Sequence, residues 1–525
     1  MRDLQAPGRS PTYATRAMAA TSSTLSTGTA LDILRAGGNA LDAAIAACAV
    51  QCVVEPGSTG IGGDNFTMWA PAGGELIAFN GSGRAPTGAT PQWFADQGLS
   101  KIERTSPHAV VVPGAVDAWV TLNRDHGRLP LADLLAPAIA FARDGYPIGQ
   151  RVASDLANAL GHLRTNEALA AIFLPDGEAP REGTLHRQPA LARTLEAIAE
   201  GGREAFYAGE VAREMVDTLH TMGGLHTMDD FATMRGEYVT PISSDYRGLT
   251  VHECPPNGQG VIALMMLNVM AGFDVADDPF SPDRIHTELE VCRQCYRARD
   301  QFLADPNMAD VPVEGMLSEG FAASIRERID MARADTTPAP FSQPHPDTVY
   351  ITVVDEERNA CSFINTLFEG WGSGITTPNS GVVLTNRAQG FSLDPDHPNA
   401  IAPGKRPLHT IIPAVATRDG ETQLSFGVMG GQYQAMGQMQ FLTRHLDYGA
   451  DVQEAMDWPR WMADPFTGAI EIERGVPDAT VKELERRGHA IERARAPIGG
   501  SQAIRLGDIL AGGSDPRKDG CAMGF

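Results

Sequence analysis

The feature that most constrains this chain is an abrupt change of pattern at Thr348. Between Asp335 and Asp347 the sequence is rich in proline, which rules out a regular helix or a central strand: Pro338, Pro340, Pro344 and Pro346. Directly afterwards, residues 348–354 are β-branched and aromatic, residues 355–359 favour a turn, and residues 360–367 form a second β-rich run. We therefore expect an exposed, extended segment that ends at the first residue of a buried hairpin.

Helical and strand patterns alternate on both sides of this junction. Apolar residues at three-to-four spacing predict helices over residues 131–143, 188–200, 210–219, 284–302, 433–446 and 481–487. Shorter β-rich runs predict strands over residues 65–70, 75–79, 381–384, 411–416, 422–428 and 502–504. Because both halves contain both kinds of element, the pattern favours one layered α+β body over two separate domains.

A glycine-rich turn follows a helix predicted over residues 40–53. Asn39 can cap that helix, Asp42 lies in its first turn, and alanines on all sides indicate burial. The glycines of residues 57–63 do not follow a strand and open a helix, as a phosphate-binding loop would. Close packing of backbone is the better explanation for them.

Charge and cysteine content exclude several classes of protein. The formal charge of −23 argues against nucleic-acid binding, which needs a surplus of lysine or arginine. The sequence contains no apolar run of about eighteen residues and no signal-like start, so we expect no membrane span and a cytoplasmic location. Cys292 and Cys295 form a CxxC pair for which buried thiols are the plainer interpretation and a zinc or redox site the alternative.

Thr348 has a chemical interpretation as well as a structural one. A threonine hydroxyl is a weak nucleophile without a base, but a free α-amine at the same residue titrates near ~8 and can take its proton. The hydroxyl could first attack the carbonyl of Asp347, so that water releases the new chain end from an ester. A plain strand threonine after Pro-Asp satisfies the same pattern, and both interpretations remain open at this point.

Ordered motifs across nearly the whole chain resemble the gamma-glutamyltranspeptidase family of N-terminal-nucleophile hydrolases. In the first part they are residues 37–44 (GGNALDAA), 54–56 (VEP), 60–63 (GIGG), 112–114 (VPG), 255–260 (PPNGQG) and Asp305-Pro306. In the second part they are Asp347-Thr348, residues 353–355 (VVD), 404–407 (GKRP), Gly430-Gly431 and 514–517 (SDPR).

The resemblance implies a four-layer αββα sandwich and a chain that cuts itself. Residues 1–347 would become the large subunit and residues 348–525 the small one, which form a heterodimer that can pair again. Thr348 falls on the family's nucleophile, Thr366 on a second threonine that hydrogen-bonds to it, and Gly430-Gly431 on the oxyanion hole. Alternatively, Thr366 is a strand residue and the glycines form an ordinary turn. The resemblance implies no metal or cofactor.

The substrate pocket departs from the family's pattern. Ser82 stands where the family has an arginine, with Arg84 two residues later, and the segment from Ser392 to Pro403 is short for a lid loop. The other departures are Arg387 for a glutamine, Gly390 for an aspartate, Phe368 for an asparagine, and His409-Thr410 for a serine pair. The loss of an anion and the gain of cations favour a carboxylated substrate, as in the lidless, oxamate-amidohydrolase-like branch.

The resemblance therefore suggests hydrolysis of a small carboxylated or gamma-glutamyl-type amide through an acyl-enzyme on Thr348. Arg387 would anchor the carboxylate, with His409, Thr410 and Arg84 also in the binding site. Arg387 could instead form a structural ion pair, and His409 could be a packing residue or a supporting donor. The alternatives are a genuine glutathione hydrolase or transpeptidase, a cephalosporin-type acylase, and an unprocessed binding protein.

Overall fold

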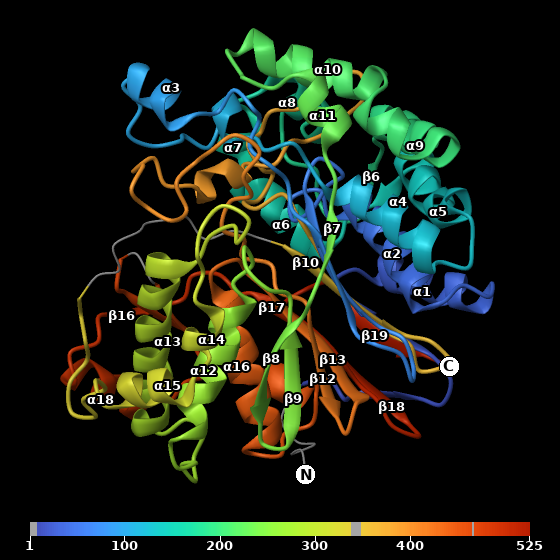
Figure 1. Ribbon diagram of the computed structural model, residues 1–525. Helices are drawn as coiled ribbons and strands as arrows, with labels where there is room; N and C mark the ends of the chain where they lie inside the picture. Colours follow the sequence, from blue (N-terminus) through green and yellow to red (C-terminus); the bar gives the residue numbers. More distant parts are fainter. Residues whose placement is uncertain (1–7, 338–347, 465–466) are drawn as a thin grey trace.

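The hairpin predicted after the proline-rich segment lies at the centre of a seven-stranded antiparallel sheet. The computed structural model describes residues 8–337, 348–464 and 467–525, so the proline-rich segment itself lies outside the described residues. The hairpin consists of β10 (Val349–Val354) and β11 (Ala360–Thr366), and the sheet has the order β19-β2-β10-β11-β3-β4-β7 (Figure 1). The other strands are β2 (Met18–Thr21), β3 (Asp64–Ala70), β4 (Ile77–Gly81), β7 (Glu237–Val239) and β19 (Cys521–Gly524).

A second seven-stranded sheet packs face to face against the first. Its order is β1-β18-β17-β13-β12-β9-β8, with the strands β1 (Thr12–Ala14), β8 (Ile242–Tyr246), β9 (Leu249–Glu253), β12 (Ala414–Arg418), β13 (Glu421–Met429), β17 (Gly500–Arg505) and β18 (Leu510–Ser514). Apolar side chains from both sheets, among them Phe66, Tyr350 and Met429, form the core between them. Each sheet therefore contains strands from both sides of residue 348.

Helices cover the outer face of each sheet. The first sheet carries α1 (Thr24–Arg35), α2 (Ala40–Val54), α4 (Ala115–His126), α5 (Leu131–Asp144) and α9 (Pro189–Tyr207), which share a second core with it. The predicted cap of α2 is confirmed, because the side chains of Asn39 and Asp42 each accept from the other residue's backbone N–H. Every residue of α2 is buried, as its alanines predicted.

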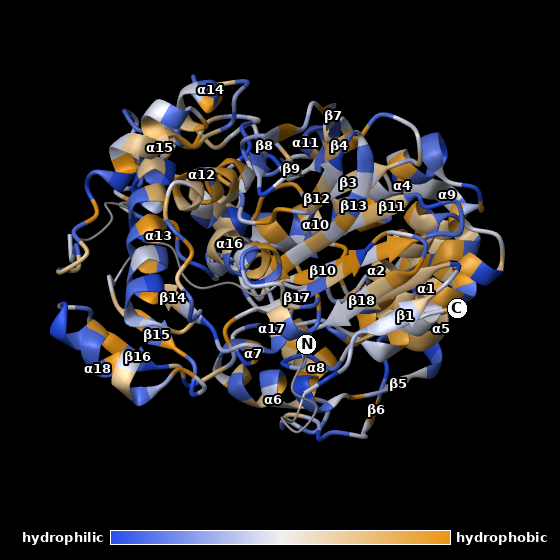
Figure 2. Ribbon diagram, turned by 90° about the horizontal axis from the view of Figure 1, so that it is seen from below, coloured by the Kyte–Doolittle hydropathy of each residue, from blue (hydrophilic) through white to orange (hydrophobic). Residues whose placement is uncertain are grey.

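The second sheet is covered by α12 (Gly260–Ala271), α13 (Pro282–Phe302) and α16 (Tyr433–Leu446), with a third core beneath them. The order helices, sheet, sheet, helices is visible in Figure 1, and Figure 2 shows the hydrophobic residues gathered in the inner strands. The four-layer αββα fold is thus confirmed. None of the described helices is long and apolar enough to cross a membrane.

The strand predicted over residues 381–384 is wrong. Val383 and Leu384 form only isolated bridges, to Thr376 and Gly62, and Gly381 before them has a left-handed backbone that interrupts a ladder. The remaining elements belong to neither seven-stranded sheet: α3 (Pro91–Asp96), η1 (Pro107–Ala109), β5 (Tyr146–Pro147), α6 (Gln150–Asn158), α7 (Leu160–Leu163), α8 (Glu167–Phe173), β6 (Leu185–His186), α10 (Glu210–Thr221), α11 (Met228–Thr233), α14 (Val313–Met316), α15 (Glu319–Arg326), η2 (Arg387–Gly390), α17 (Glu454–Asp457), β14 (Trp461–Ala463), β15 (Ile470–Ile472), α18 (Asp478–Arg486) and β16 (Ile491–Arg493).

Candidate active site

Thr348, Thr366 and Asp64 lie side by side at one end of three neighbouring strands. Thr366 is the register partner of Asp64, and the pairing of Val349 with Asn365 continues to Thr348 opposite Thr366. The two hydroxyl oxygens, Thr348 Oγ1 and Thr366 Oγ1, are 3.2 Å apart and buried. Two of the predicted catalytic residues are therefore within hydrogen-bond distance of each other.

The Gly430–Gly431 turn lies at the level of Thr348 on the facing sheet. Two contacts set the register between β10 and β13: the Tyr350 ring lies over Gly427, and Thr352 Oγ1 is 2.7 Å from Ser425 Oγ. Residue numbers rise along β10 where they fall along β13, so Thr352 faces Ser425 and Tyr350 faces Gly427. The next residue of β10 on this face in the same direction, Thr348, therefore lies opposite Met429. The glycine turn begins with the next residue.

Both glycines of this turn have left-handed backbones, with φ of 112° and 51°. A Cβ on Gly430 would lie 2.8 Å from the Cα of Gly499, so the close approach also requires glycine there. Neither glycine N–H donates to an acceptor within residues 8–337, 348–464 and 467–525. Two such N–H groups can stabilise a developing oxyanion, and one donor of this kind is typically worth ~3 kcal/mol.

Arg387 is a fully buried cation that faces Asp64, the register partner of Thr366. Its guanidinium stacks on the Phe368 ring at 3.8 Å, and its Nη1 donates to Thr410 Oγ1 (3.3 Å). Its Nε is 3.7 Å from Asp64 Oδ2, but neither Nε nor Nη2 has a hydrogen-bond partner among the described residues. Burial lowers the pKa of Arg387, and the nearby Asp64 and Glu369 carboxylates oppose that shift.

A buried N–H donor without a partner costs roughly 1–3 kcal/mol, and more when the group is charged. The Nε and Nη2 groups of Arg387 are thus suited to bind an anionic ligand, whose oxygens would supply the missing acceptors.

His409 is neutral and both of its ring nitrogens are occupied. Its Nε2 is 3.1 Å from Asp64 Oδ2, while its Nδ1 accepts from the Ile411 N–H (3.3 Å), which fixes the tautomer. Burial, and then the neighbouring Arg387, lower the pKa of His409 to about 4. His409 therefore has no free nitrogen with which to act as a general base.

Asp64 joins these groups, and the sequence interpretation missed it. One carboxylate oxygen accepts from the Gly83 N–H (2.7 Å), and the other faces His409 and Arg387. The available signal was a lone carboxylate placed directly after the glycines of residues 60–63, at the start of a strand. Asp64 comes from the first part of the chain, whereas Arg387 and His409 both come from the part after Thr348.

The loop after Thr366 adopts an unusual backbone. Phe368 and Trp371 have φ of 80° and 68°, and non-glycine residues in this region cost on the order of 1–3 kcal/mol each. The Phe368 N–H donates to Thr366 Oγ1 (2.9 Å), so the loop orients the hydroxyl that faces Thr348.

Arg84 is not joined to the other predicted site residues. Its Nη1 donates to the Gly404 carbonyl (3.0 Å), and its Nη2 is 3.8 Å from Glu237. No hydrogen bond or ion pair links it to the remaining seven candidates among the residues that the structure describes. Substrate binding by Arg84 stays a prediction.

One group of described residues, His286, Glu290 and His489, has ligand atoms close enough to hold a metal, within 4.8 Å of one another. His286 Nδ1 is 2.8 Å from His489 Nε2, and Arg293 Nη1 lies 2.6 Å from Glu290 and 3.2 Å from His489 Nδ1. The guanidinium of Arg293 therefore already supplies positive charge next to the atoms that would bind a metal. The predicted CxxC cysteines are buried thiols without a disulfide.

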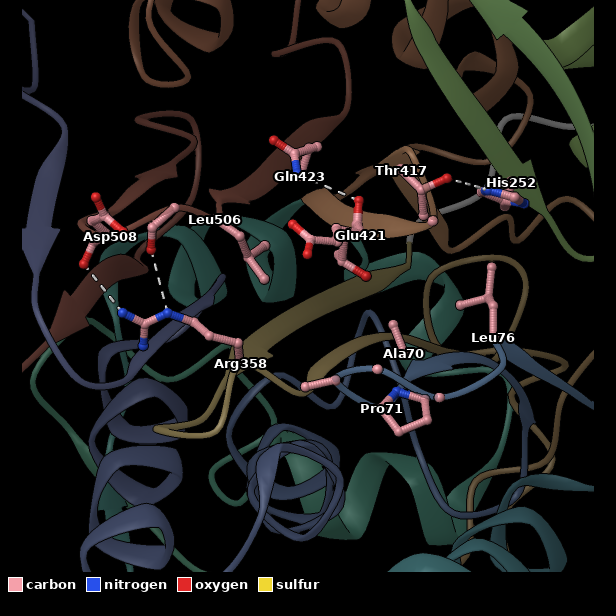
Figure 3. Close-up of a pocket in the computed structure, with 16 residues that line it drawn as sticks. Ala70, Pro71, Leu76, His252, Arg358, Thr417, Glu421, Gln423, Leu506 and Asp508 are labelled. Atoms are coloured by element: carbon pink, nitrogen blue, oxygen red, sulfur yellow. Dashed lines mark hydrogen bonds between the residues drawn. The ribbon is translucent and has the colours of Figure 1, made fainter.

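A pocket of about 630 Å³ lies at the opposite end of the sheets (Figure 3). It is lined by strand ends and turns within residues 70–76, 417–423 and 506–508, and by Arg358. Arg358 donates to the carbonyls of Gly507 (3.3 Å) and Asp508 (3.2 Å). Arg358 follows the end of β10, whose length separates it from Thr348 by ~20 Å. This pocket is therefore separate from the threonine pair.

Comparison with known proteins gives one consistent family. The profile described as gamma-glutamyltranspeptidase matches residues 26–525. The glutathione hydrolase-like YwrD proenzyme of Bacillus subtilis is 37% identical, over 94% of this chain and 95% of its own length. The oxamate amidohydrolase proenzyme of Klebsiella pneumoniae is 34% identical, over 98% of this chain and 100% of its own length.

A solved structure matches with the same extent. The cephalosporin acylase from Bacillus halodurans superposes with a TM-score of 0.93 and 38% identity, covering 100% of this chain and 99% of that one. Similarity of this extent spans both sheets and both helical layers.

Proposed function

Because the chain belongs to the gamma-glutamyltranspeptidase family of hydrolases, we propose that it cuts itself between Asp347 and Thr348 and then hydrolyses small carboxylated amides. The observation that carries this proposal is the Thr348–Thr366 hydroxyl pair next to Asp64, which faces the buried guanidinium of Arg387. Similar proteins are named as proenzymes, which supports a processed chain.

The cleavage and the turnover use the same hydroxyl. In the first step, Thr348 Oγ1 attacks the Asp347 carbonyl, the C–N bond breaks, and an ester and a free α-amine form. Water hydrolyses that ester and leaves a carboxylate on Asp347. In turnover, the α-amine takes the hydroxyl proton as Oγ1 attacks the substrate amide, and then returns it to the leaving amine. Water releases the acyl group from Thr348, and Gly430 and Gly431 would stabilise both oxyanions.

Arg387 supports the choice of a carboxylated substrate. Its unpartnered nitrogens can form charge-assisted hydrogen bonds with a carboxylate, and Thr410 holds the guanidinium in place. The absence of an aspartate at Gly390 removes the expected partner of an α-ammonium group. We therefore favour substrates such as oxamate and glutaryl amides over glutathione.

The two fragments would remain together after the cut. Strands β10 and β11 lie between β2 and β3, so residues 348–525 are an integral part of a sheet built by residues 1–347. We propose this heterodimer, alone or as a pair of two heterodimers, as the assembly.

A second candidate is acylase action on cephalosporin side chains, which the similarity to the Bacillus halodurans acylase favours. Both candidates use an acyl-enzyme on Thr348 and differ in the acyl group. A binding protein that never matures remains a third outcome of the experiment below.

The test of processing is a denaturing gel with N-terminal sequencing of the smaller fragment. We expect the fragment to start at Thr348 and the variant Thr348→Ala to remain uncut. Thr352→Ala is the matched control, because it removes a buried threonine hydroxyl that lies on β10 four residues after Thr348, on the same face of the sheet. It should be cut like the wild type. A wild-type chain that stays whole, or a Thr348→Ala chain that is cut, contradicts the mechanism.

The test of specificity compares two anilides of the same acyl length, glutaryl and valeryl, which differ by one carboxylate. We expect kcat/KM to favour the glutaryl anilide, and Arg387→Met to remove the preference while hydrolysis of the valeryl anilide persists. A wild-type enzyme with no preference would mean that Arg387 is a structural cation.

A further inference from the structure

Arg104 holds the loop that follows Thr366 from a distant part of the chain. Its Nε donates to the Gly372 carbonyl (3.0 Å), its Nη2 donates to the Gly370 carbonyl, and its Nη1 is 3.2 Å from Glu369. One guanidinium thus contacts three residues of a short loop. Neither the sequence patterns nor the family resemblance drew attention to Arg104.

The loop needs such support because its backbone is unfavourable. Phe368 and Trp371 both have left-handed conformations, which persist only where the surroundings fix them. The Trp371 N–H donates to the Gly57 carbonyl (2.9 Å), and a Cβ on Gly57 would lie 3.1 Å from the indole. Arg104 and Gly57 therefore hold the loop from two sides.

The same loop controls the two groups that the proposed reaction uses. Through the Phe368 N–H it orients the Thr366 hydroxyl, and through the Phe368 ring it supports the Arg387 guanidinium. Glu369 adds a second connection, since its N–H donates to Asn386 Oδ1 (3.1 Å) and its carboxylate accepts from Asn386 Nδ2 (2.7 Å). Asn386 directly precedes Arg387.

Charge gives Arg104 a second effect. Glu369 is buried and lies close enough to Arg387 for the two charges to influence each other's pKa. Arg104 pairs with Oε2 of Glu369, while Asn386 donates to Oε1. Without Arg104, Glu369 would be left with Arg387 as its nearest cation and would compete with a substrate carboxylate for the free nitrogens.

We propose that Arg104 is a positioning residue of the active site, which holds the 368–372 loop in place and keeps Glu369 from neutralising Arg387. The proposal rests on the proposed function for the identity of the reacting groups. Arg104 touches the loop carbonyls and Glu369 and acts through them.

The experiment measures kcat/KM for the glutaryl and valeryl anilides in Arg104→Ala, Glu369→Gln and the double variant. We expect Arg104→Ala to lower kcat/KM on the glutaryl anilide by about a hundredfold, as a misplaced reacting group does. The loss on the valeryl anilide should be smaller, so the carboxylate preference falls. The double variant should regain the preference, because the neutral amide no longer competes for Arg387.

Arg164→Ala is the matched control, since Arg164 also donates to a loop carbonyl, that of Gly177 (2.9 Å), and faces a carboxylate, Glu178 at 3.4 Å. It should leave both rates and the preference unchanged. If Arg104→Ala does not fold, Arg104→Lys replaces it: the ammonium keeps the Glu369 pair but cannot reach both carbonyls, so both rates should fall while the preference stays.

The proposal is overturned if Arg104→Ala keeps both rates within twofold, or if the double variant shows no more preference than Arg104→Ala. A wild-type enzyme without any glutaryl preference contradicts the proposed substrate instead. In that case the valeryl anilide still tests the positioning role. If Arg104→Ala loses more valeryl hydrolysis than Arg164→Ala does, Arg104 positions the Thr366 hydroxyl; if the two lose the same, it does not.

Discussion

Asp64 connects the charge of the candidate active site to the stability of the fold. It is the only carboxylate within 4 Å of Arg387 among the residues described, and it also accepts from His409 and from the Gly83 N–H. The side chains of Asp64, Arg387 and His409 are all buried. Removing one partner of a buried ion pair leaves an uncompensated charge, whereas the intact pair adds little by itself.

We predict opposite effects of Asp64→Asn on stability and on substrate binding. The free energy of unfolding should fall by about 3–5 kcal/mol, because Arg387 loses its counter-ion and one amide oxygen cannot serve all of the donors. The KM for the glutaryl anilide should fall relative to that for the valeryl anilide, because Arg387 then has no carboxylate within 4 Å among the described residues that competes with the substrate. Denaturant unfolding and steady-state kinetics measure the two effects.

Asp305→Asn is the control for that variant. Asp305 is also buried, but within the described part of the chain its carboxylate oxygens accept only from the backbone N–H groups of Asn307 (3.0 Å) and Arg406 (2.9 Å). It should reduce stability and leave the ratio of the two KM values unchanged. A KM ratio that is the same in Asp64→Asn and the wild type would argue against competition between Asp64 and the substrate.

At the scale of elements, the close contact between β3 and β11 depends on Gly63. A Cβ at this position would lie 2.0 Å from the Thr366 carbonyl oxygen. We predict that Gly63→Ala lowers the free energy of unfolding by about 1–3 kcal/mol through overpacking and slows self-cleavage, because Thr366 must shift.

Gly28→Ala, in α1, is the matched substitution, since its Cβ would have no neighbour within 4 Å. It should stabilise the protein by up to ~1 kcal/mol, because glycine is unfavourable within a helix. Thermal unfolding and the time course of cleavage on a gel measure both variants. Equal cleavage rates for the two would show that Thr366 does not depend on this contact.

Local sequence signals predicted the elements whose causes are local. The Asn39 cap, the alanine-rich helix and the hairpin after Thr348 follow from neighbouring residues, and they lie within a few residues of the predicted bounds. The strand predicted over residues 381–384 failed because a β-rich run forms a ladder only where a partner strand is available. Asp64 and Arg104 could not be predicted, because the fold alone brings them to Arg387 and to the 368–372 loop.

At the scale of the whole molecule, buried histidines make the fold sensitive to acid. His186, His226 and His409 are buried, and desolvation lowers the pKa of each to about 4. In the unfolded chain they titrate near 6.5, so between these values the unfolded state binds more protons than the folded state. Stability is unaffected by them above pH ~6.5 and falls as the pH drops toward 4.

We predict that the free energy of unfolding decreases over this window by up to about 1.4 kcal/mol per pH unit for each such histidine. Denaturant unfolding at a series of pH values measures the slope. His226→Gln should make the slope shallower. His220→Gln is the control, because His220 is an exposed neighbour whose ring contacts the His226 carbonyl. A slope that His226→Gln leaves unchanged would show that other groups cause the acid sensitivity.

The interleaved strands determine whether two mutant alleles of this protein can complement each other. β10 and β11 insert between β2 and β3, and β18 pairs with β1, so the two parts of the proposed cleaved form share both sheets. We therefore expect them to fold while they are still one chain. We expect no exchange of parts between molecules once they have formed. Two defective alleles, one damaged before residue 348 and one after it, should therefore fail to complement each other in the same cell.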